Sequence, residues 1–249
     1  MINEILTPLN HREIEYNAKG LSGSEIPDSP IYESDEAKAL LDWIGQTGNK
    51  VFDDDLVMDY GTDCLRLYLL FENTPKEQDA PFYESWNEGA LEGMYKFLGR
   101  YRRMILTASA WNRRGGYLDL SKESMEKMQG AFEDTKKKID RCIRRANTMP
   151  NRHNIVSALM ELLNILQKEL KIGAIVTEIR QHVVDVAVPK SSVSQLVHEE
   201  ITDGDKDRTT MQHDENEAVT QLCRDFIILM APIACDLSKI LWQEIAQAA

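Results

Sequence analysis

The sequence predicts an all-α protein built as a helical bundle. In three long segments, apolar residues recur every three or four positions, which is the period of a helix with one buried face. The joints between these segments hold Gly, Pro and Asn, as at 112–116 and 150–151. With 249 residues, of which 43% are apolar, the chain is long enough to bury a sizeable core.

The beginning of the sequence is its least regular part. Residues 1–35 hold turn signals but no sustained period, so we expect a small irregular lobe with one strand candidate at 13–16. A short helix is expected at 36–43, ended by Gly45 and Gly48.

Two further short helices are predicted, one on each side of Gly61. Carboxylates at 53–55 suit a helix N-terminus, and the helix that they open should stop near Gly61. Thr62 or Asp63 is expected to cap the next helix, which runs to about Phe71. A polar loop follows to about residue 87.

The three long periodic segments come next. The apolar residues of 94–105 share one face of a helix, and Lys96, Arg100 and Arg103 share a neighbouring stripe. From 125 to 149 the spacing alternates between three and four, as in the seam of a bundle. A third amphipathic helix is expected at 155–170. The seam residues are Met125, Met128, Phe132, Thr135, Ile139, Cys142, Ala146 and Met149.

The last part of the sequence is mixed. The Val- and Ile-rich stretch at 172–188 fits a helix or a strand, and 203–216 is polar enough to be a mobile loop. A helical period returns at 218–248, and we expect Pro232 to kink that helix.

Charge is distributed unevenly along the chain. The formal net charge is −12, which taken alone argues against nucleic acid as a partner. The segment 96–152, however, holds fifteen basic and six acidic residues, a net charge of +9, so the remainder carries −21. Such a basic segment is either a solvated helical surface or a contact for a polyanion. Composition alone leaves both readings open.

Motifs for catalysis and for cofactors are missing from the sequence. No phosphate-binding glycine loop, zincin or hydrolase motif occurs, so no catalytic residue, cofactor or metal site is predicted. Four widely spaced cysteines favour a reducing, cytoplasmic location over a disulfide framework. The longest uncharged apolar stretch has ten residues, and the N-terminus has no signal-like pattern, so we expect neither a membrane partner nor secretion.

Four stretches resemble the leucyl-tRNA synthetase family. Residues 47–71 (TGNKVFDDDLVMDYGTDCLRLYLLF) are similar to the segment that follows the family's KMSKS loop. Trp86 and 92–100 (EGMYKFLGR) resemble the helix after it, 157–164 (SALMELLN) a later helix, and 229–242, which contains LMAPIA and Leu-Trp, the last one. The four matches occur in the family's order, so as a set they are specific.

The resemblance implies a class I synthetase anticodon-binding helical bundle at 47–249. It also implies a small irregular N-terminal lobe at 1–46 with a degenerate KMSKS region, and an insertion at about 171–217. In this family the bundle packs against the inside of the tRNA without needing to read the anticodon bases, which calls for Lys and Arg at phosphate spacing. The residues expected to contact phosphates are Lys96, Arg100, Arg103, Arg113, Arg114, Lys137, Lys138, Arg141, Arg144 and Arg145.

The departures from the family pattern concern catalysis. The KMSKS positions read Asp-Trp-Ile-Gly-Gln at 42–46, so Asp42 and Gly45 stand where the family has lysines that stabilise the triphosphate. No HIGH-type motif occurs. We therefore expect that this chain does not aminoacylate tRNA on its own, in the manner of a pseudoenzyme.

Three hypotheses follow for the function. In the first, the chain is a catalytically incomplete tRNA-binding module that acts in trans or as an accessory or regulatory protein. In the second, it is a protein-interaction module, with a synthetase or another protein as partner, that has lost RNA binding. In the third, it is one part of a split leucyl-tRNA synthetase. The altered residues at 42–46 count against the third.

Overall fold

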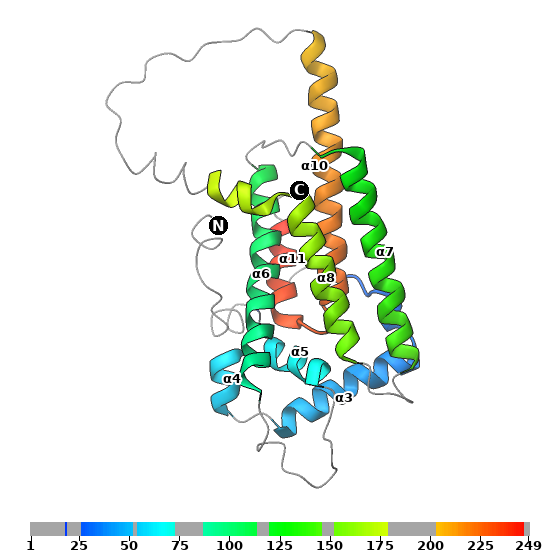
Figure 1. Cartoon of the computed structure of the whole chain (residues 1–249), viewed down its shortest axis with the longest axis vertical. Coiled ribbons are helices and arrows are strands. Elements are labelled where there is room, and N and C mark those ends of the chain that lie inside the picture. The colour runs from blue at the N-terminus through cyan, green and yellow to red at the C-terminus, as the bar shows by residue number, and fades with distance from the viewer. Residues whose placement is uncertain are drawn as a thin grey trace, which may run out of the picture.

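Every element in the described part of the chain is helical, as the sequence predicts. The structure is a computed structural model, and it describes residue 18 and residues 26–51, 54–72, 87–113, 120–145, 152–178 and 203–246. The later helices run along the long axis of the molecule, and the earlier ones lie across its lower end (Figure 1).

The five long-axis helices form the bundle. They are α6 (Glu88–Arg113), α7 (Lys122–Arg144), α8 (His153–Glu169), α10 (Asp203–Met230) and α11 (Cys235–Ala246). Successive helices alternate in direction, so α7 lies antiparallel to α8, and α10 to α11 (Figure 1). The three long periodic segments of the sequence correspond to α6, α7 and α8, so the helices that the 3.6-residue period predicts are confirmed.

The lower end of the bundle is closed by the four described elements that directly precede α6 in the chain. They are the 3-10 helix η1 (Pro30–Tyr32) and the helices α3 (Asp35–Val51), α4 (Asp54–Tyr60) and α5 (Thr62–Glu72). Helix α5 is the best buried of them, and it packs against α3, α6 and α8. Because α5 contacts both α3 at the lower end and the long-axis helices α6 and α8, it joins the two parts of the fold.

The core is a single apolar cluster with an aromatic centre. Tyr101 of α6 and Phe226 of α10 meet edge to face at 5.0 Å between ring centroids. Phe132 of α7 makes a second edge-to-face contact with Phe226, at 6.1 Å. All three rings are buried. Edge-to-face pairs add about 0.5–1.5 kcal/mol to the gain from burial, so this triad fixes how three helices meet.

The helix predicted at 36–43 is longer in the structure. Helix α3 continues through Gly45 and Gly48 to Val51, so the prediction that these glycines end it is wrong. A glycine inside a helix costs about 1 kcal/mol relative to alanine. Burial of Ala37, Leu40 and Ile44 in the common core outweighs that cost. The expected boundary between 46 and 47 falls inside this helix, and its buried residues belong to the bundle core.

Two predictions near the C-terminal end are also corrected. The polar stretch 203–216, expected as a loop, is the first part of α10. Acidic residues at 203, 205 and 207 favour a helix N-terminus, and the buried remainder of α10 supplies the costly helical nucleus. The chain around Pro232 makes a turn between α10 and α11, so the helix expected at 218–248 is broken rather than kinked.

Several predicted features lie outside the described residues. They are the strand candidate at 13–16, most of the loop before residue 87, the turn at 114–116 and the stretch 179–202. Of the segment that fits helix or strand, 172–178 is described and is helical.

Asp63 has a different role from the one its position suggests. It lies in the first turn of α5, two residues after Gly61, whose φ of 78° is in the left-handed region. The carboxylate, however, accepts hydrogen bonds from the backbone N–H groups of Leu237 (2.8 Å) and Asp236 (3.3 Å), so it caps α11. Nη1 of Arg66 lies 3.4 Å from Oδ1 of the same carboxylate. Burial raises the pKa of Asp63 to about 6, although these partners oppose the rise.

Substitutions at Gly45 and Gly61 test the backbone conformation at two positions. No atom lies within 4 Å of a Cβ built on Gly45, so we expect Gly45→Ala to raise the free energy of unfolding by about 0.5–1 kcal/mol. Gly61→Ala places a side chain on a residue with left-handed backbone, so it should lower the free energy of unfolding by about 1 kcal/mol or more. Urea denaturation of both variants measures the two changes, and a loss of stability in Gly45→Ala would contradict the account of α3.

The cap on α11 predicts a pH dependence of stability. Because the folded-state pKa of Asp63 lies above the usual value of 3.8, the folded state holds this proton more tightly than the unfolded chain does. The proton on Asp63 stabilises the folded state fully below about pH 4, and this stabilisation is lost as the pH rises through about 6. We expect the stability advantage of the wild type over Asp63→Asn to shrink over this range by up to about 3 kcal/mol. An advantage that grows with pH would mean that the helix N-terminus outweighs burial.

Candidate nucleic-acid interface

The basic segment of the sequence maps to α6, α7 and the start of α8. Helices α7 and α8 lie side by side on one flank of the bundle (Figure 1). The buried seam of α7 consists of Met128, Phe132, Thr135, Ile139 and Ile143. Because the seam takes one face of the helix, the basic residues of α7 are left on its exposed faces.

Several of the predicted phosphate contacts are already engaged with carboxylates. Lys96 pairs with Glu92 at 2.7 Å, Lys137 with Asp134 at 3.7 Å, and Arg144 with Asp140 at 2.9 Å, each within its own helix. Lys138 reaches across to Glu161 of α8, at 2.6 Å. Exposed pairs of this kind contribute about 0.2–1 kcal/mol and are screened by salt. A stronger anion can therefore displace these carboxylates, but the pairs reduce the charge available to it.

Arg100 has a place in the packing of the bundle. Its Nε and Nη2 donate to Oε1 of Gln167 at 3.1 and 2.7 Å, and Nη2 also donates to Asn164. Gln167 in turn donates to the backbone oxygen of Arg100, at 3.3 Å. These contacts join α6 to α8, so Arg100 serves as an interhelical clamp. A phosphate contact by this residue stays a prediction.

The other predicted residues of α6 are only partly described. Arg103 is exposed, and no ion pair joins it to any described residue. Arg113 ends α6, but its side chain and all of Arg114 lie outside the described part.

Arg141 and Arg145 line a hollow between α7 and α8. The hollow has a volume of about 280 Å³, and Lys138, Asn154, Ser157 and Glu161 are among its other lining residues. The Nε atom of Arg141 donates to the backbone oxygen of Lys137 at 3.1 Å, and both arginine side chains are exposed. Of the ten predicted residues, the structure brings Lys138, Arg141 and Arg145 together around this one hollow.

Cys142 also lines the hollow, and the pKa of its thiol depends on the charges nearby. Burial raises the pKa of its thiol, while the positive charges of Arg141 and Arg145 lower it. Arg141, Cys142 and Arg145 all line the same hollow.

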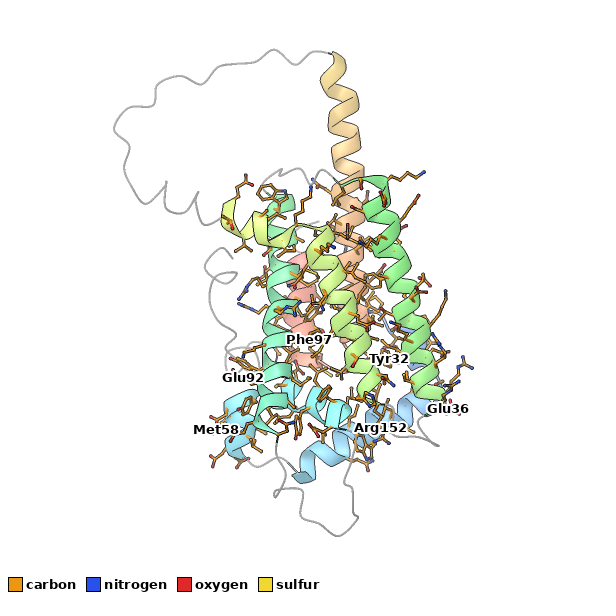
Figure 2. The ribbon with its side chains drawn as sticks, viewed as in Figure 1. Tyr32, Glu36, Met58, Glu92, Phe97 and Arg152 are labelled. Carbon is orange, nitrogen blue, oxygen red and sulfur yellow. The ribbon has the colours of Figure 1, made fainter. Side chains whose placement is uncertain are left out.

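Sequence reasoning missed two groups of residues at this end of the bundle. Asn154 and Ser157 line the hollow, but neither residue type signals a binding site by itself. Arg152 belongs to the basic segment, yet its guanidinium lies 4.0 Å from the centroid of the Trp43 ring of α3. Figure 2 shows Arg152 at the lower end of α8, where α8 meets α3.

Metal ligands do not cluster in the part of the chain that the structure describes. No group of three or more His, Cys, Asp and Glu side chains there is arranged to hold a metal ion. Nor is any helix among the described residues both long enough and apolar enough to span a bilayer. The geometry is that of a basic, mostly solvated flank on an all-α bundle.

Comparison with known proteins relates this bundle to one family. The chain is 32% identical to leucine–tRNA ligase of Coxiella burnetii over 131 residues, which are 49% of this chain and 14% of that protein. It is 27% identical to leucine–tRNA ligase of Petrotoga mobilis over 200 residues, 79% of this chain and 19% of that protein. The match to the enzyme of Pseudothermotoga lettingae is 29% over 121 residues. No family model and no solved structure matches the chain.

The fold and the relatives define the class of this protein. The described residues form an all-α helical bundle, and the chain spans only about 13–19% of the length of the relatives that it matches. The curated relatives are leucine–tRNA ligases, so the resemblance found in the sequence is confirmed: the chain is related to part of the leucyl-tRNA synthetase family.

The clamp formed by Arg100 can be tested by its effect on stability. Arg100→Met keeps the apolar stem of the side chain but removes the hydrogen bonds to α8, so we expect the free energy of unfolding to fall by about 1 kcal/mol. The control is Arg103→Met, an exposed change on the same helix that should alter stability by less than about 0.5 kcal/mol. Equal effects in urea denaturation would mean that the contacts with Asn164 and Gln167 contribute nothing.

Proposed function

We propose that this chain is a tRNA-binding module that contacts the sugar–phosphate backbone through the basic flank of α6, α7 and α8. The observation that carries the proposal is the meeting of Arg141 and Arg145 at one hollow, on a bundle related to leucine–tRNA ligases. Guanidinium groups suit phosphate because their planar donors match two of its oxygens. The lining of the hollow carries a net charge of +2, in a chain whose overall charge is −12.

The predicted contacts of α7 fall into a primary and a secondary group. Arg141 and Arg145 are the primary contacts, since they face the hollow. Lys137, Lys138 and Arg144 are secondary, because a phosphate must first displace Asp134, Glu161 or Asp140. Each displacement costs at most about 1 kcal/mol, which is within reach of a polyanion that releases counterions on binding.

The residues at the KMSKS positions do not supply a catalytic loop in this proposal. Positions 42–46 lie within α3, where Ile44 is buried and Trp43 lies beneath Arg152. A packed helix of this kind has neither the lysines nor the freedom of a phosphate-binding loop. We therefore assign this segment no part in adenylate formation, and the module acts as an accessory or regulatory RNA-binding unit.

A second candidate function is a protein-interaction module. The observation that favours it is the number of basic residues already paired with carboxylates, together with the −21 carried by the chain outside 96–152. In that case the basic helices are solvated surface, and their partner is a protein rather than RNA.

Titration with unfractionated tRNA tests the first function against the second. We expect binding that weakens steeply with salt, with a slope of log affinity against log salt of about −2 or steeper, because at least two phosphates are neutralised. Electrophoretic shifts and fluorescence anisotropy between about 50 and 200 mM salt measure this slope.

Recovery of the protein from cells gives the complementary measurement. RNA that copurifies and can be sequenced supports the tRNA-binding function and names the RNA. A synthetase or other protein recovered without RNA, together with no shift by tRNA at low salt, would establish the second candidate instead.

A further inference from the structure

We propose that the outer face of helix α4 is a docking surface for an amphipathic basic helix of a protein partner. This surface, the α4 corner, consists of Met58 and five exposed carboxylates, which belong to Asp54, Asp55 and Asp59 of α4 and to Glu88 and Glu92 of α6. The inference goes beyond the proposed function and does not depend on RNA binding.

Helix α4 is less buried than the helix that follows it. None of the residues of α4 is buried, whereas most residues of α5 are. Isolated helices shorter than about 12–15 residues are marginal in water, because most helical stability comes from the packing of an apolar face. A helix as short and as exposed as α4 therefore gains stability from a partner that covers it.

The sequence of α4 is apolar on two sides. Leu56 and Tyr60 are four positions apart, so they share one face of the helix, and both are half-buried against the core. Met58 lies two positions from each, which at about 100° per residue places it on the opposite side. Within the described residues, Met58 is the large apolar residue that is exposed, with 47% of its surface accessible. Figure 2 shows it at the lower corner of the molecule, on the outer edge of α4.

This two-sided pattern indicates what is needed to complete the helix. An apolar stripe on a surface helix normally faces a packed neighbour, and a helix that is apolar on more than one side is typical of a buried position. The bundle covers the side that carries Leu56 and Tyr60. We assign the side that carries Met58 to an apolar side chain of a partner.

The carboxylates beside Met58 determine the charge of that partner. Asp54 and Asp55 precede Met58 by four and three positions, so they lie next to it on the surface of the helix, and both are exposed. A partner that covered Met58 with apolar groups alone would take these carboxylates out of water without compensation, which is unfavourable. Lysine or arginine side chains beside the apolar anchor remove this cost and add attraction.

The α4 corner continues onto α6. The rings of Tyr60 and Tyr95 meet edge to face at 6.3 Å between centroids, which joins the end of α4 to α6. Burial raises the pKa of Tyr60, and the negative charges of Glu88, Asp59 and Glu92 raise it further. The acidic residues of both helices thus act on the same ring.

The charge of the α4 corner excludes other classes of occupant. Lys96 pairs with Glu92 at 2.7 Å, and together with this lysine the five carboxylates carry a net charge of −4. A phosphate backbone or an anionic lipid surface would be repelled. A second copy of this chain fits poorly as well, because symmetric pairing would bring one acidic corner against the other. In Figure 1, α4 and α7 lie on opposite sides of the molecule, so a protein at the α4 corner would leave the hollow accessible.

A synthetic helical peptide with leucine on one face and lysine on the other faces is the probe. Its fluorescein-labelled form is titrated with the full chain, and anisotropy measures the affinity. Two further peptides separate the two requirements, since one replaces lysine by glutamate and the other replaces leucine by glutamine. We expect each of them to bind at least about tenfold more weakly.

Substitution of Met58 tests the apolar part of the surface. Met58→Gln keeps the length of the side chain but removes its apolar character, so it should weaken binding of the leucine–lysine peptide about fivefold. Met58→Leu keeps an apolar side chain and should bind this peptide as the wild type does.

A pair of carboxylates tests the charged part. Asp54→Asn combined with Asp55→Asn should weaken peptide binding about fivefold and make its salt dependence shallower. The matched control combines Glu123→Gln with Glu126→Gln, which removes two exposed carboxylates near the start of α7, on the opposite side of the molecule. The control should change binding less than about twofold. Circular dichroism melting checks that every variant is folded.

Three results would overturn the assignment. If Met58→Gln and the aspartate variant bind the peptide as the control does, the charge of the whole protein holds the peptide and the α4 corner is not a docking surface. If sedimentation shows a wild-type dimer that Met58→Gln makes monomeric, the occupant is a second copy. If a soluble nitroxide does not broaden the methyl NMR signal of Met58 in the wild type, this chain already covers the surface. None of these results bears on the binding of tRNA, so the two proposals fail separately.

Discussion

The fold depends on one buried carboxylate that joins two distant parts of the chain. Asp63 lies in the first turn of α5 and caps α11, so the layer across the lower end of the bundle is tied to α11. Helix α11 needs such a cap because the break around Pro232 leaves its first N–H groups without helical partners. Taking the carboxylate out of water is unfavourable, and the two backbone donors and Arg66 compensate in part. Neighbouring α6 packs on both α5 and α11, so its position follows from the same link.

Much of the fold can be predicted from the sequence, because its long helices bury one regular face. The spacing of Met128, Phe132 and Ile139 places α7 correctly, and Leu159 and Leu166 do the same for α8. The prediction fails where tertiary contacts overrule local signals. Gly45 reads as a helix stop, but burial of Ile44 carries α3 past it. Asp63 reads as a cap for its own helix, because nothing local shows that residues 236 and 237 will lie beside it.

The candidate site could be predicted in type but not in detail. Counting charges identifies the basic segment, because Lys and Arg are visible in any sequence. Which of them can meet an anion depends on partners far along the chain: Glu161 for Lys138, Asn164 and Gln167 for Arg100, and Trp43 for Arg152. The relation to leucine–tRNA ligases directs attention to RNA. The packing of α7 on α8 then places Arg141 and Arg145 at one hollow, which a count of charges cannot show.

The cap made by Asp63 has a consequence for the order in which the protein is assembled. Asp63 and Leu237 are separated by 174 residues. At synthesis rates of about 5–20 residues per second, the ribosome needs about 9–35 s to make the second after the first. During that interval the Asp63 carboxylate has no helix to cap and stays hydrated, and the apolar surfaces meant for α11 are uncovered. The newly made bundle is therefore most exposed to chaperones and proteases immediately before its last helix arrives.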